Sequence, residues 1–188
     1  IVAGAALAPL SAQSSLAPVR WQGRVMGADA DLTLFGATQG ILNGAVALIR
    51  RLEATFSLYD PSSELSRLNR DSGGLISAQM HGLLRHCDQI NQATKGILDP
   101  TIQPVFAALL NGEPPPWDRV GWHKLGFDAE QVTLAPGQAL SFNGIAQGYV
   151  TDQVKAYLVE AGLTNALLSL GEHGAIGGPF RLSLEDPD

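Results

Sequence analysis

The stretch FNGIAQGYVTD, residues 142–152, places Gly144 and Gly148 four residues apart at what the pattern predicts is the start of a helix. Glycine is among the poorest residues for a helix interior, so a pair of glycines here needs another reason. One such reason is a ligand or a second backbone that must come close to the helix. The amides of a first helical turn point outward and can receive phosphate oxygens. The glycines could equally admit a neighbouring strand, because helix–sheet packing also uses glycine. The stretch by itself leaves both interpretations open.

The expected helix runs from Asn143, as its cap, to its stop at Gly162. On this helix Gly144 and Gly148 share one face with Thr151 and Lys155. The apolar side chains cover the opposite face: Ile145, Tyr149, Val150, Val154, Tyr157 and Leu158.

The elements around this helix are of mixed type. Two alternating segments, 19–26 and 29–36, predict paired strands around Gly27. Apolar periodicity and capping residues predict helices over 38–57, 62–69, 77–96 and 101–110. Further strands are expected over 131–135 and 139–142, on either side of the Pro136-Gly137 turn, and late in the chain over 165–171 and 180–187. Hairpins and long helices without regular strand–helix alternation favour an α+β fold.

Composition and charge exclude several classes of function. The 188 residues carry a net charge of −6, with a pI of about 5.1 and a mean hydropathy of +0.09, so no basic surface indicates nucleic acid or anionic lipid. The single cysteine, Cys87, rules out an internal disulfide framework and a multi-cysteine metal site. Cys87 fits a small apolar helix residue, with a reactive thiol as the alternative. The four histidines do not stand at metal-ligand spacing.

Residues 1–18 differ from the rest of the chain. They are Ala-rich, then small and polar, and they carry no charge. This composition predicts the remnant of an export signal, and hence a periplasmic protein; a disordered leader or a buried N-terminal arm is the alternative. The run is too short and too Pro-interrupted to span a membrane. Residues 19–188 are then expected to form the working domain.

Several motifs occur in a fixed order along that domain. They are SLYDPSSELSRLN (57–69), GILDPTIQPVF (96–106), FNGIAQGYVTDQV (142–154), LLSLGEHGAIGG (167–178) and LSLEDP (182–187). In this order the sequence resembles the periplasmic flavin transferases known as the ApbE family, the FAD:protein FMN transferases, over residues of about 20 to 188. The stretches NGIAQGYVTD and LGEHGAIG resemble most the branch that matures the nitrous oxide reductase system. The resemblance implies two intertwined subdomains with mixed or antiparallel sheets and packed helices.

The resemblance also implies an activity and its site. The family is expected to bind FAD, to use Mg²⁺ at the pyrophosphate, and to move FMN onto a Thr or Ser hydroxyl of an acceptor protein. No protein nucleophile is required, because the attacking hydroxyl belongs to the acceptor. By their match to the family pattern, position by position, the residues expected to contact FAD are Met26 in the stretch RVMGAD, Tyr59, Ile97, Leu98, Asp99, Gln147, and Ser141 just before the glycine helix. Gly144 matches a metal-proximal position, where a backbone carbonyl could be the ligand.

These roles have plainer alternatives. Tyr59 could be an ordinary half-buried aromatic, and Asp99 could simply hold its Asp-Pro turn. Two positions also depart from the family pattern, with Ser141 where many members have Asp and Gln147 where Lys or Glu is usual.

The family pattern continues past LEDP into a His-x-x-Asp-Pro segment for the flavin and an Asp/Thr cluster for the metal, so the domain is expected to be C-terminally incomplete. The activities that therefore remain open are the transferase, a non-catalytic FAD-binding maturation factor, and an FAD pyrophosphatase that releases FMN and AMP.

Overall fold

The structure, a computed structural model, describes residues 17–180 of the chain. The leader predicted over residues 1–18 lies outside this range apart from Ala17 and Pro18, and the strand predicted over 180–187 lies outside it apart from Phe180. No helix within the range is long and apolar enough to cross a membrane.

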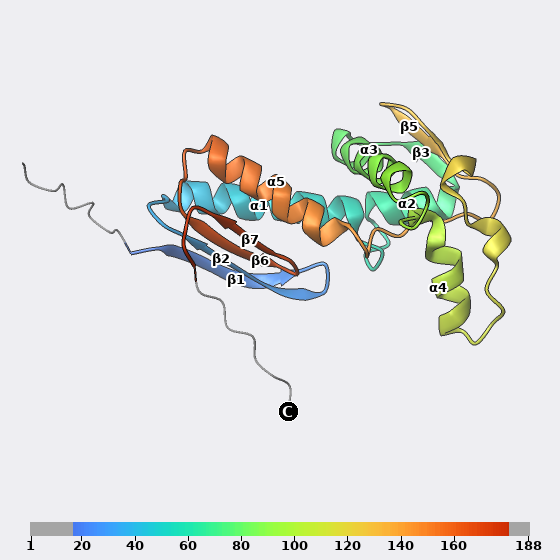
Figure 1. Cartoon of the computed structure of the whole chain (residues 1–188), viewed down its shortest axis with the longest axis horizontal. Coiled ribbons are helices and arrows are strands. Elements are labelled where there is room, and N and C mark those ends of the chain that lie inside the picture. The colour runs from blue at the N-terminus through green and yellow to red at the C-terminus, as the bar shows by residue number, and fades with distance from the viewer. Residues whose placement is uncertain (1–16, 181–188) are drawn as a thin grey trace, which may run out of the picture.

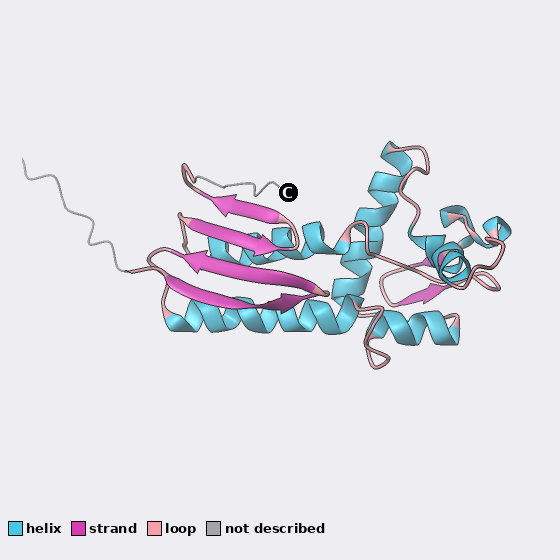
Figure 2. Cartoon of the chain, turned by 90° about the horizontal axis from the view of Figure 1, so that it is seen from below, coloured by secondary structure: helices cyan, strands magenta, loops and turns pink. Residues whose placement is uncertain are grey.

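One half of the molecule is built on a four-stranded antiparallel sheet (Figures 1 and 2). Its strands are β1 (Val19–Val25), β2 (Ala28–Leu34), β6 (Ala166–Leu170) and β7 (His173–Ile176), in the order β1-β2-β6-β7. Val25 pairs with Ala28, so Met26 and Gly27 alone form the first turn. The hairpin predicted around Gly27 is therefore confirmed.

Two long helices pack on this sheet. Helix α1 (Gln39–Phe56) begins at Thr38, whose side chain accepts a hydrogen bond from the Ile41 amide. Helix α5 (Ala146–Glu160) contacts α1, β6 and β7. The apolar stripe predicted for the first helix faces the core, where Ile49 and Leu52 are buried. Hydrophobic burial thus holds both helices against the sheet.

The other half combines one long helix, α3 (Ala78–Ala93), with several short elements. Helices α2 (Glu64–Asp71) and α3 begin at serine caps, Ser63 and Ser77. They accompany a small sheet of order β3-β5-β4, made of Gly73–Leu75, Gln131–Thr133 and Gly126–Phe127. Helix α4 (Gln103–Leu110) follows a 3-10 turn, Pro100–Ile102, and two more such turns lie at Trp117–Arg119 and Trp122–Lys124.

The two halves share one hydrophobic core, which extends from β1 through α1 and α3 to β6. Helices and antiparallel sheets in this arrangement confirm the α+β prediction.

The hairpin predicted over 131–135 and 139–142 is wrong. Strand β5 ends at Thr133 and pairs with β3 and β4 instead. The segment 139–142 is outside any sheet, because its main chain bonds elsewhere: the Leu140 amide donates to the Asn69 side chain and the Ser141 amide to the Pro100 carbonyl. Polar groups distant in sequence satisfy this backbone, so the alternating pattern alone could not place it.

The predicted start of the last helix is also wrong. Helix α5 begins at Ala146, two residues later than expected, with Ile145 as its cap in place of Asn143 and no side-chain capping bond. The amides of Ile145 and Ala146 both donate to the carbonyl of Phe142, which closes a turn ahead of the helix. Gly144 lies in this turn, whereas Gly148 does lie in the first helical turn.

Candidate functional site

A small pocket of about 120 Å³ lies where the β1–β2 turn meets the C-terminal end of α1 and the start of α5. It brings together three residues that the resemblance assigned to FAD: Met26, Tyr59 and Gln147. These residues are far apart in sequence and come from three elements. We call this space the Met26 pocket; it is lined by Met26, Phe56, Ser57, Leu58, Tyr59, Asn143, Ala146 and Gln147.

Serine hydroxyls shape the loop that carries Tyr59. The Ser57 Oγ accepts hydrogen bonds from the amides of Tyr59 and Asp60, at 3.1 and 3.2 Å. The hydroxyls of Ser63, the cap of α2, and of Ser66, in its first turn, donate to the Ser57 carbonyl. The serines of this motif therefore fix the backbone and leave the tyrosine ring free.

Tyr59 itself is 77% exposed. The alternative of a half-buried core aromatic is thus wrong, and the ring is open to a ligand. Ser62 donates to the Asp60 carboxylate through both its hydroxyl and its amide, and these bonds hold the pKa of Asp60 below its ordinary value. Asp60 is therefore ionised at neutral pH beside this ring.

A second, larger cavity of about 610 Å³ adjoins the turn at 142–145. It collects the other residues assigned to the site: Ile97, Leu98, Asp99, Ser141 and Gly144. We call it the Ile97 cavity; the rest of its lining is Gly96, Pro100, Ile102, Phe106, Trp117, Val120, Asn143 and Ile145. A volume of this size falls in the usual range for small-molecule sites, which are mostly apolar with a few placed polar groups.

Asp99 lies at the edge of the Ile97 cavity, with its carboxylate engaged in the protein. One oxygen accepts from the amide and hydroxyl of Thr101, at 2.9 and 2.6 Å, and the other accepts from the Trp122 amide at 2.9 Å. The carboxylate therefore ties its own turn to residue 122. This is the plainer role considered for Asp99, and a ligand contact would have to share these oxygens.

Ser141 and Gly144 differ in exposure. Ser141 is buried, and its Oγ accepts from the Asn143 amide at 3.4 Å, so it braces the turn. Gly144 is exposed, and a Cβ built on it would meet only the Leu98 side chain, at 4.0 Å. The Gly144 backbone is thus open to a ligand or an ion.

Two further cavities flank the same turn. One, of about 350 Å³, covers the start of α5 and is lined by His86, Asn143, Gly144, Ile145, Gln147, Gly148, Tyr149, Asp152 and Glu172. The other, of about 460 Å³, follows α4 and is lined by Leu58, Tyr59, Gln103, Phe106, Leu109, Leu110 and Asn143. We call them the α5 cavity and the α4 cavity.

The α5 cavity decides between the two interpretations of the glycines. A Cβ built on Gly148 would meet nothing within 4 Å. Close packing against a strand is therefore not the reason for glycine at this position. The Gln147 carboxamide packs over Gly171, which has a φ of +86° and no room for a Cβ. Gln147 lines both the Met26 pocket and the α5 cavity.

Asn143 lines all four of these cavities. The sequence suggested it only as a helix cap, and no local signal marks it as a junction. Its position depends on Asn69 of α2, whose side chain donates to the Leu140 carbonyl at 2.8 Å and accepts from the Leu140 amide at 2.7 Å. The asparagine that ends the serine motif thus holds the segment leading to the turn.

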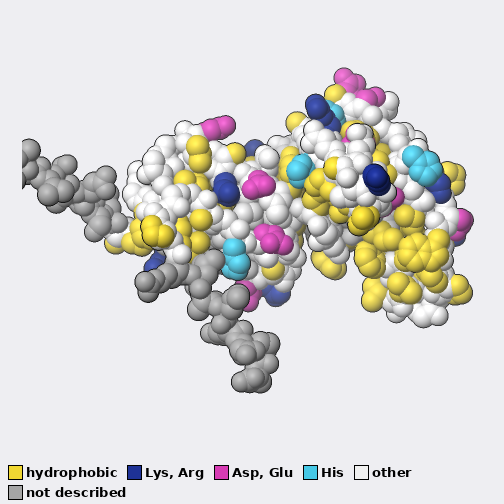
Figure 3. All heavy atoms as spheres, viewed as in Figure 1, with side chains coloured by type: hydrophobic (Ala, Val, Ile, Leu, Met, Phe, Trp, Pro, Cys, Tyr) yellow, Lys and Arg dark blue, Asp and Glu magenta, His cyan; other side chains and the backbone are white. Residues whose placement is uncertain are grey.

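The α4 end of the molecule exposes much apolar surface (Figure 3). Within residues 17–180, six of the nine exposed large hydrophobic side chains lie around the cavities: Tyr59, Ile97, Phe106, Leu109, Leu110 and Trp117. Exposed apolar patches of this kind mark interaction sites more often than exposed single residues do.

Ionisable groups in the described range offer little else. No set of three His, Cys, Asp or Glu side chains within residues 17–180 is placed to hold a metal ion. Cys87 is fully buried, and this burial raises the pKa of its thiol to about 12. The reactive-thiol alternative is therefore wrong, since the thiolate is the reactive form.

Comparison with known proteins identifies relatives of this chain. Residues 26–188 match the ApbE family. An FAD:protein FMN transferase of Haemophilus influenzae is 28% identical over 171 residues, and the match covers 75% of this chain and 49% of that protein. The chain therefore spans about half the length of this relative.

Two solved structures share the fold. A mutant of the flavin transferase ApbE from Vibrio cholerae superposes with a TM-score of 0.79 at 22% identity, covering 91% of this chain and 68% of its own. The apo form of the flavinyl transferase ApbE from Pseudomonas stutzeri gives 0.77 at 20% identity, covering 89% and 65%. Together with the family match over most of its length, these likenesses show that the chain belongs to the ApbE family.

Proposed function

We propose that this chain forms the FAD-binding part of an FAD:protein FMN transferase. The observation that carries the proposal is the convergence of all eight site residues on two adjoining cavities that share Asn143. Five of them line the Ile97 cavity, four from two motifs and Ser141 from the position directly before the second of these motifs, and three more line the Met26 pocket. A fold used for another purpose has no reason to gather these positions around open space.

The residues suit the parts of a dinucleotide. The exposed ring of Tyr59 offers a face for stacking an aromatic ring system. The Ile97 cavity offers apolar surface to a second ring. The open backbone at Gly144 and the first turn of α5 can receive the pyrophosphate, since helix N-termini favour anions.

In the proposed reaction a Thr or Ser oxygen of the acceptor protein forms a bond to the FMN phosphorus. The bond between the two phosphates breaks, AMP leaves, and the hydroxyl proton is released. Transfers of this kind depend on positioning and charge neutralisation more than on a protein nucleophile. The residues that we assign therefore bind and orient FAD, and we assign none as a nucleophile.

Magnesium enters the proposal through the family resemblance. The described residues do not fit a magnesium site by themselves, because the Gly144 backbone stands near no cluster of acidic side chains within residues 17–180. We also propose, from the composition of residues 1–18, that the protein is exported to the periplasm.

The direct test mixes the chain with FAD, Mg²⁺ and a Thr-containing acceptor peptide, with a Val-containing peptide as control. The proposal predicts an adduct on the Thr peptide alone, heavier by the mass of an FMN group. Free FMN and AMP without an adduct would instead support a pyrophosphatase. FAD binding without turnover would support the FAD site, but would favour a non-catalytic maturation factor over a transferase that acts through this chain alone. No binding of FAD would contradict all three.

A further inference from the structure

The backbone of Met26 is unusual for its sequence. Met26 and Gly27 form the two-residue turn between β1 and β2, with φ of +48° and +84°. Such turns require a positive φ at both positions and favour Asn-Gly or Gly-Gly. A methionine there is held in a conformation that side chains larger than Asn rarely adopt. Strain of this kind persists only where the surroundings enforce it, and it concentrates at ligand sites.

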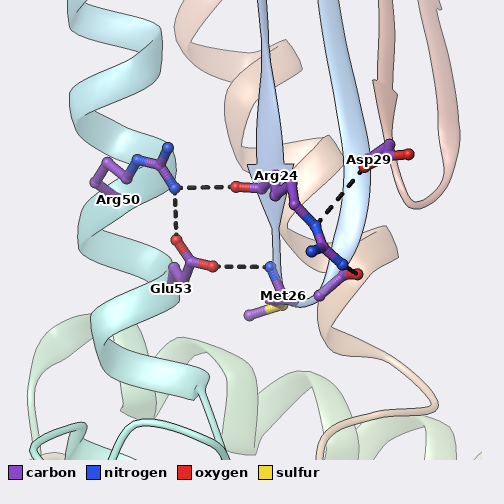
Figure 4. Close-up of polar contacts among 6 residues, drawn as sticks. Arg24, Met26, Asp29, Arg50 and Glu53 are labelled. Atoms are coloured by element: carbon purple, nitrogen blue, oxygen red, sulfur yellow. Dashed lines mark hydrogen bonds and ion pairs between the residues drawn. The ribbon is translucent and has the colours of Figure 1, made fainter.

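A side chain on α1 enforces this conformation (Figure 4). The Glu53 carboxylate accepts the Met26 amide on Oε1 at 2.9 Å. Its other oxygen accepts from the Arg50 guanidinium at 2.8 Å. Glu53 lies one turn before Phe56, which itself lines the Met26 pocket. The carboxylate therefore ties the turn to the helix that forms a wall of this pocket.

Arg50 is in turn fixed from two sides. Its guanidinium donates to the Arg24 carbonyl at 3.0 Å and lies over the Trp21 ring, 5.7 Å from the ring centre. On the far side of the turn, Arg24 donates to the Gly27 carbonyl at 2.7 Å. The network thus runs from β1 through α1 to the turn without using any residue of the pocket except Met26.

We propose that Glu53, braced by Arg50, is a positioning residue for the flavin nucleotide, which holds the Met26 side chain at the Met26 pocket. The inference rests on the proposed function for the identity of the ligand. A turn that served only to connect β1 and β2 would be better served by Asn at position 26. In this proposal the side chain of Met26 is the reason for a methionine in the turn, and Glu53 holds the backbone that orients this side chain.

The test combines FAD titration with a cycle of variants of the whole chain. Glu53→Ala should raise the dissociation constant for FAD about tenfold, which corresponds to about 1.4 kcal/mol. Glu53→Gln should have a smaller effect, because its amide oxygen can still accept the Met26 amide. Glu160→Ala is the control: this exposed residue ends α5, about 20 Å from Ala146 by the helical rise, and should leave FAD binding unchanged.

The cycle is completed in a second background. Met26→Asn suits the turn and removes the side chain, so it should weaken FAD binding without loss of thermal stability. In that background Glu53→Ala should change the dissociation constant by less than about twofold, because coupled residues are not additive. Equal effects of Glu53→Ala on the dissociation constant in both backgrounds would mean that Glu53 acts on FAD binding independently of the Met26 side chain, and would overturn the proposal.

A readout without ligand separates this inference from the proposed function. The chain has only two methionines, Met26 and the fully buried Met80, so methyl-labelled protein should give two resonances. Glu53→Ala should shift the Met26 methyl resonance and leave that of Met80 in place. An unmoved Met26 methyl would overturn the positioning role even if FAD binds. Failure of the unsubstituted chain to bind FAD would overturn the proposed function, and the methyl spectrum would still decide the role of Glu53.

Discussion

In the half built on the four-stranded sheet, Leu32 and Leu168 are fully buried, whereas Leu110 at the end of α4 is 88% exposed. The first half buries most of its apolar side chains in the shared core, beneath α1 and α5. The second half has strands of only two or three residues, and it turns much of its apolar surface outward around the cavities. The difference indicates that one half provides the scaffold and the other provides most of the surface for a ligand or partner.

The largest effect should come from the scaffold. Leu168→Ala should lower the free energy of unfolding by about 2–5 kcal/mol, through lost burial and the cavity left behind. The same change at Leu110 should stay within about 0.5 kcal/mol, as is usual for exposed positions. Urea denaturation of both variants measures the two values. Similar losses at the two sites would mean that α4 is part of the core, and the contrast between the halves would fail.

The next effect concerns the link between α2 and the turn at 142–145. Asn69→Ala should cost about 2 kcal/mol, because the buried Leu140 loses partners for both its amide and its carbonyl. FAD binding should weaken as well, since the segment leading to Asn143 is no longer held. Arg70→Ala, which removes only an exposed ion pair with Asp71, is the control and should change neither quantity. An Asn69 variant as stable as this control would contradict the role of the tie.

A smaller effect is expected at Tyr59. Because the ring is exposed, Tyr59→Ala should leave the melting temperature unchanged and should weaken FAD binding by about 1 kcal/mol through lost stacking. Tyr59→Phe keeps the aromatic face and should bind FAD as well as the unsubstituted chain. The titration would speak against stacking if the Ala and Phe variants bound FAD equally.

The last effect, at Gly148, is a small gain in stability. With nothing within 4 Å of a Cβ there, Gly148→Ala should raise stability by up to about 1 kcal/mol through helix propensity. The added methyl enters the α5 cavity, so FAD affinity should fall. Gly40→Ala, in the first turn of α1 and about 24 Å along that helix from Phe56, should match the stability gain without the loss of affinity. A destabilised Gly148 variant with normal FAD affinity would revive the packing interpretation.

Local chemistry made part of the fold predictable. The caps Thr38, Ser63 and Ser77 and the turn at Gly27 are local signals, and the elements that they border agree with expectation. Strand β3 begins with two glycines, which are poor strand residues, and its pairing with β5 spans almost sixty residues. The backbone of 139–142 depends on Asn69, at a similar distance in sequence. Contacts between residues so far apart in the sequence leave no periodic pattern in it.

The site residues divide in the same way, between those that the sequence could identify and those whose role depends on long-range contacts. The motifs identified Met26, Tyr59 and Gln147, and the structure brings these three together in one pocket. The sequence alone could not show that Asp99 uses its carboxylate on Thr101 and Trp122, nor that Asn143 lies where four cavities meet. It also gave no reason to select Glu53, whose role depends on the strained turn opposite it.

The central claim is that FAD binds at the junction of cavities around Asn143. The most direct test is a fluorescence titration of FAD against the unsubstituted chain and Asn143→Trp, with the melting temperature of each. Asn143 is exposed, so the indole should leave folding intact while it fills the junction. The account predicts that Asn143→Trp melts at the same temperature and binds FAD at least about tenfold more weakly, a difference of about 1.4 kcal/mol. Equal affinity of the two proteins for FAD would contradict it.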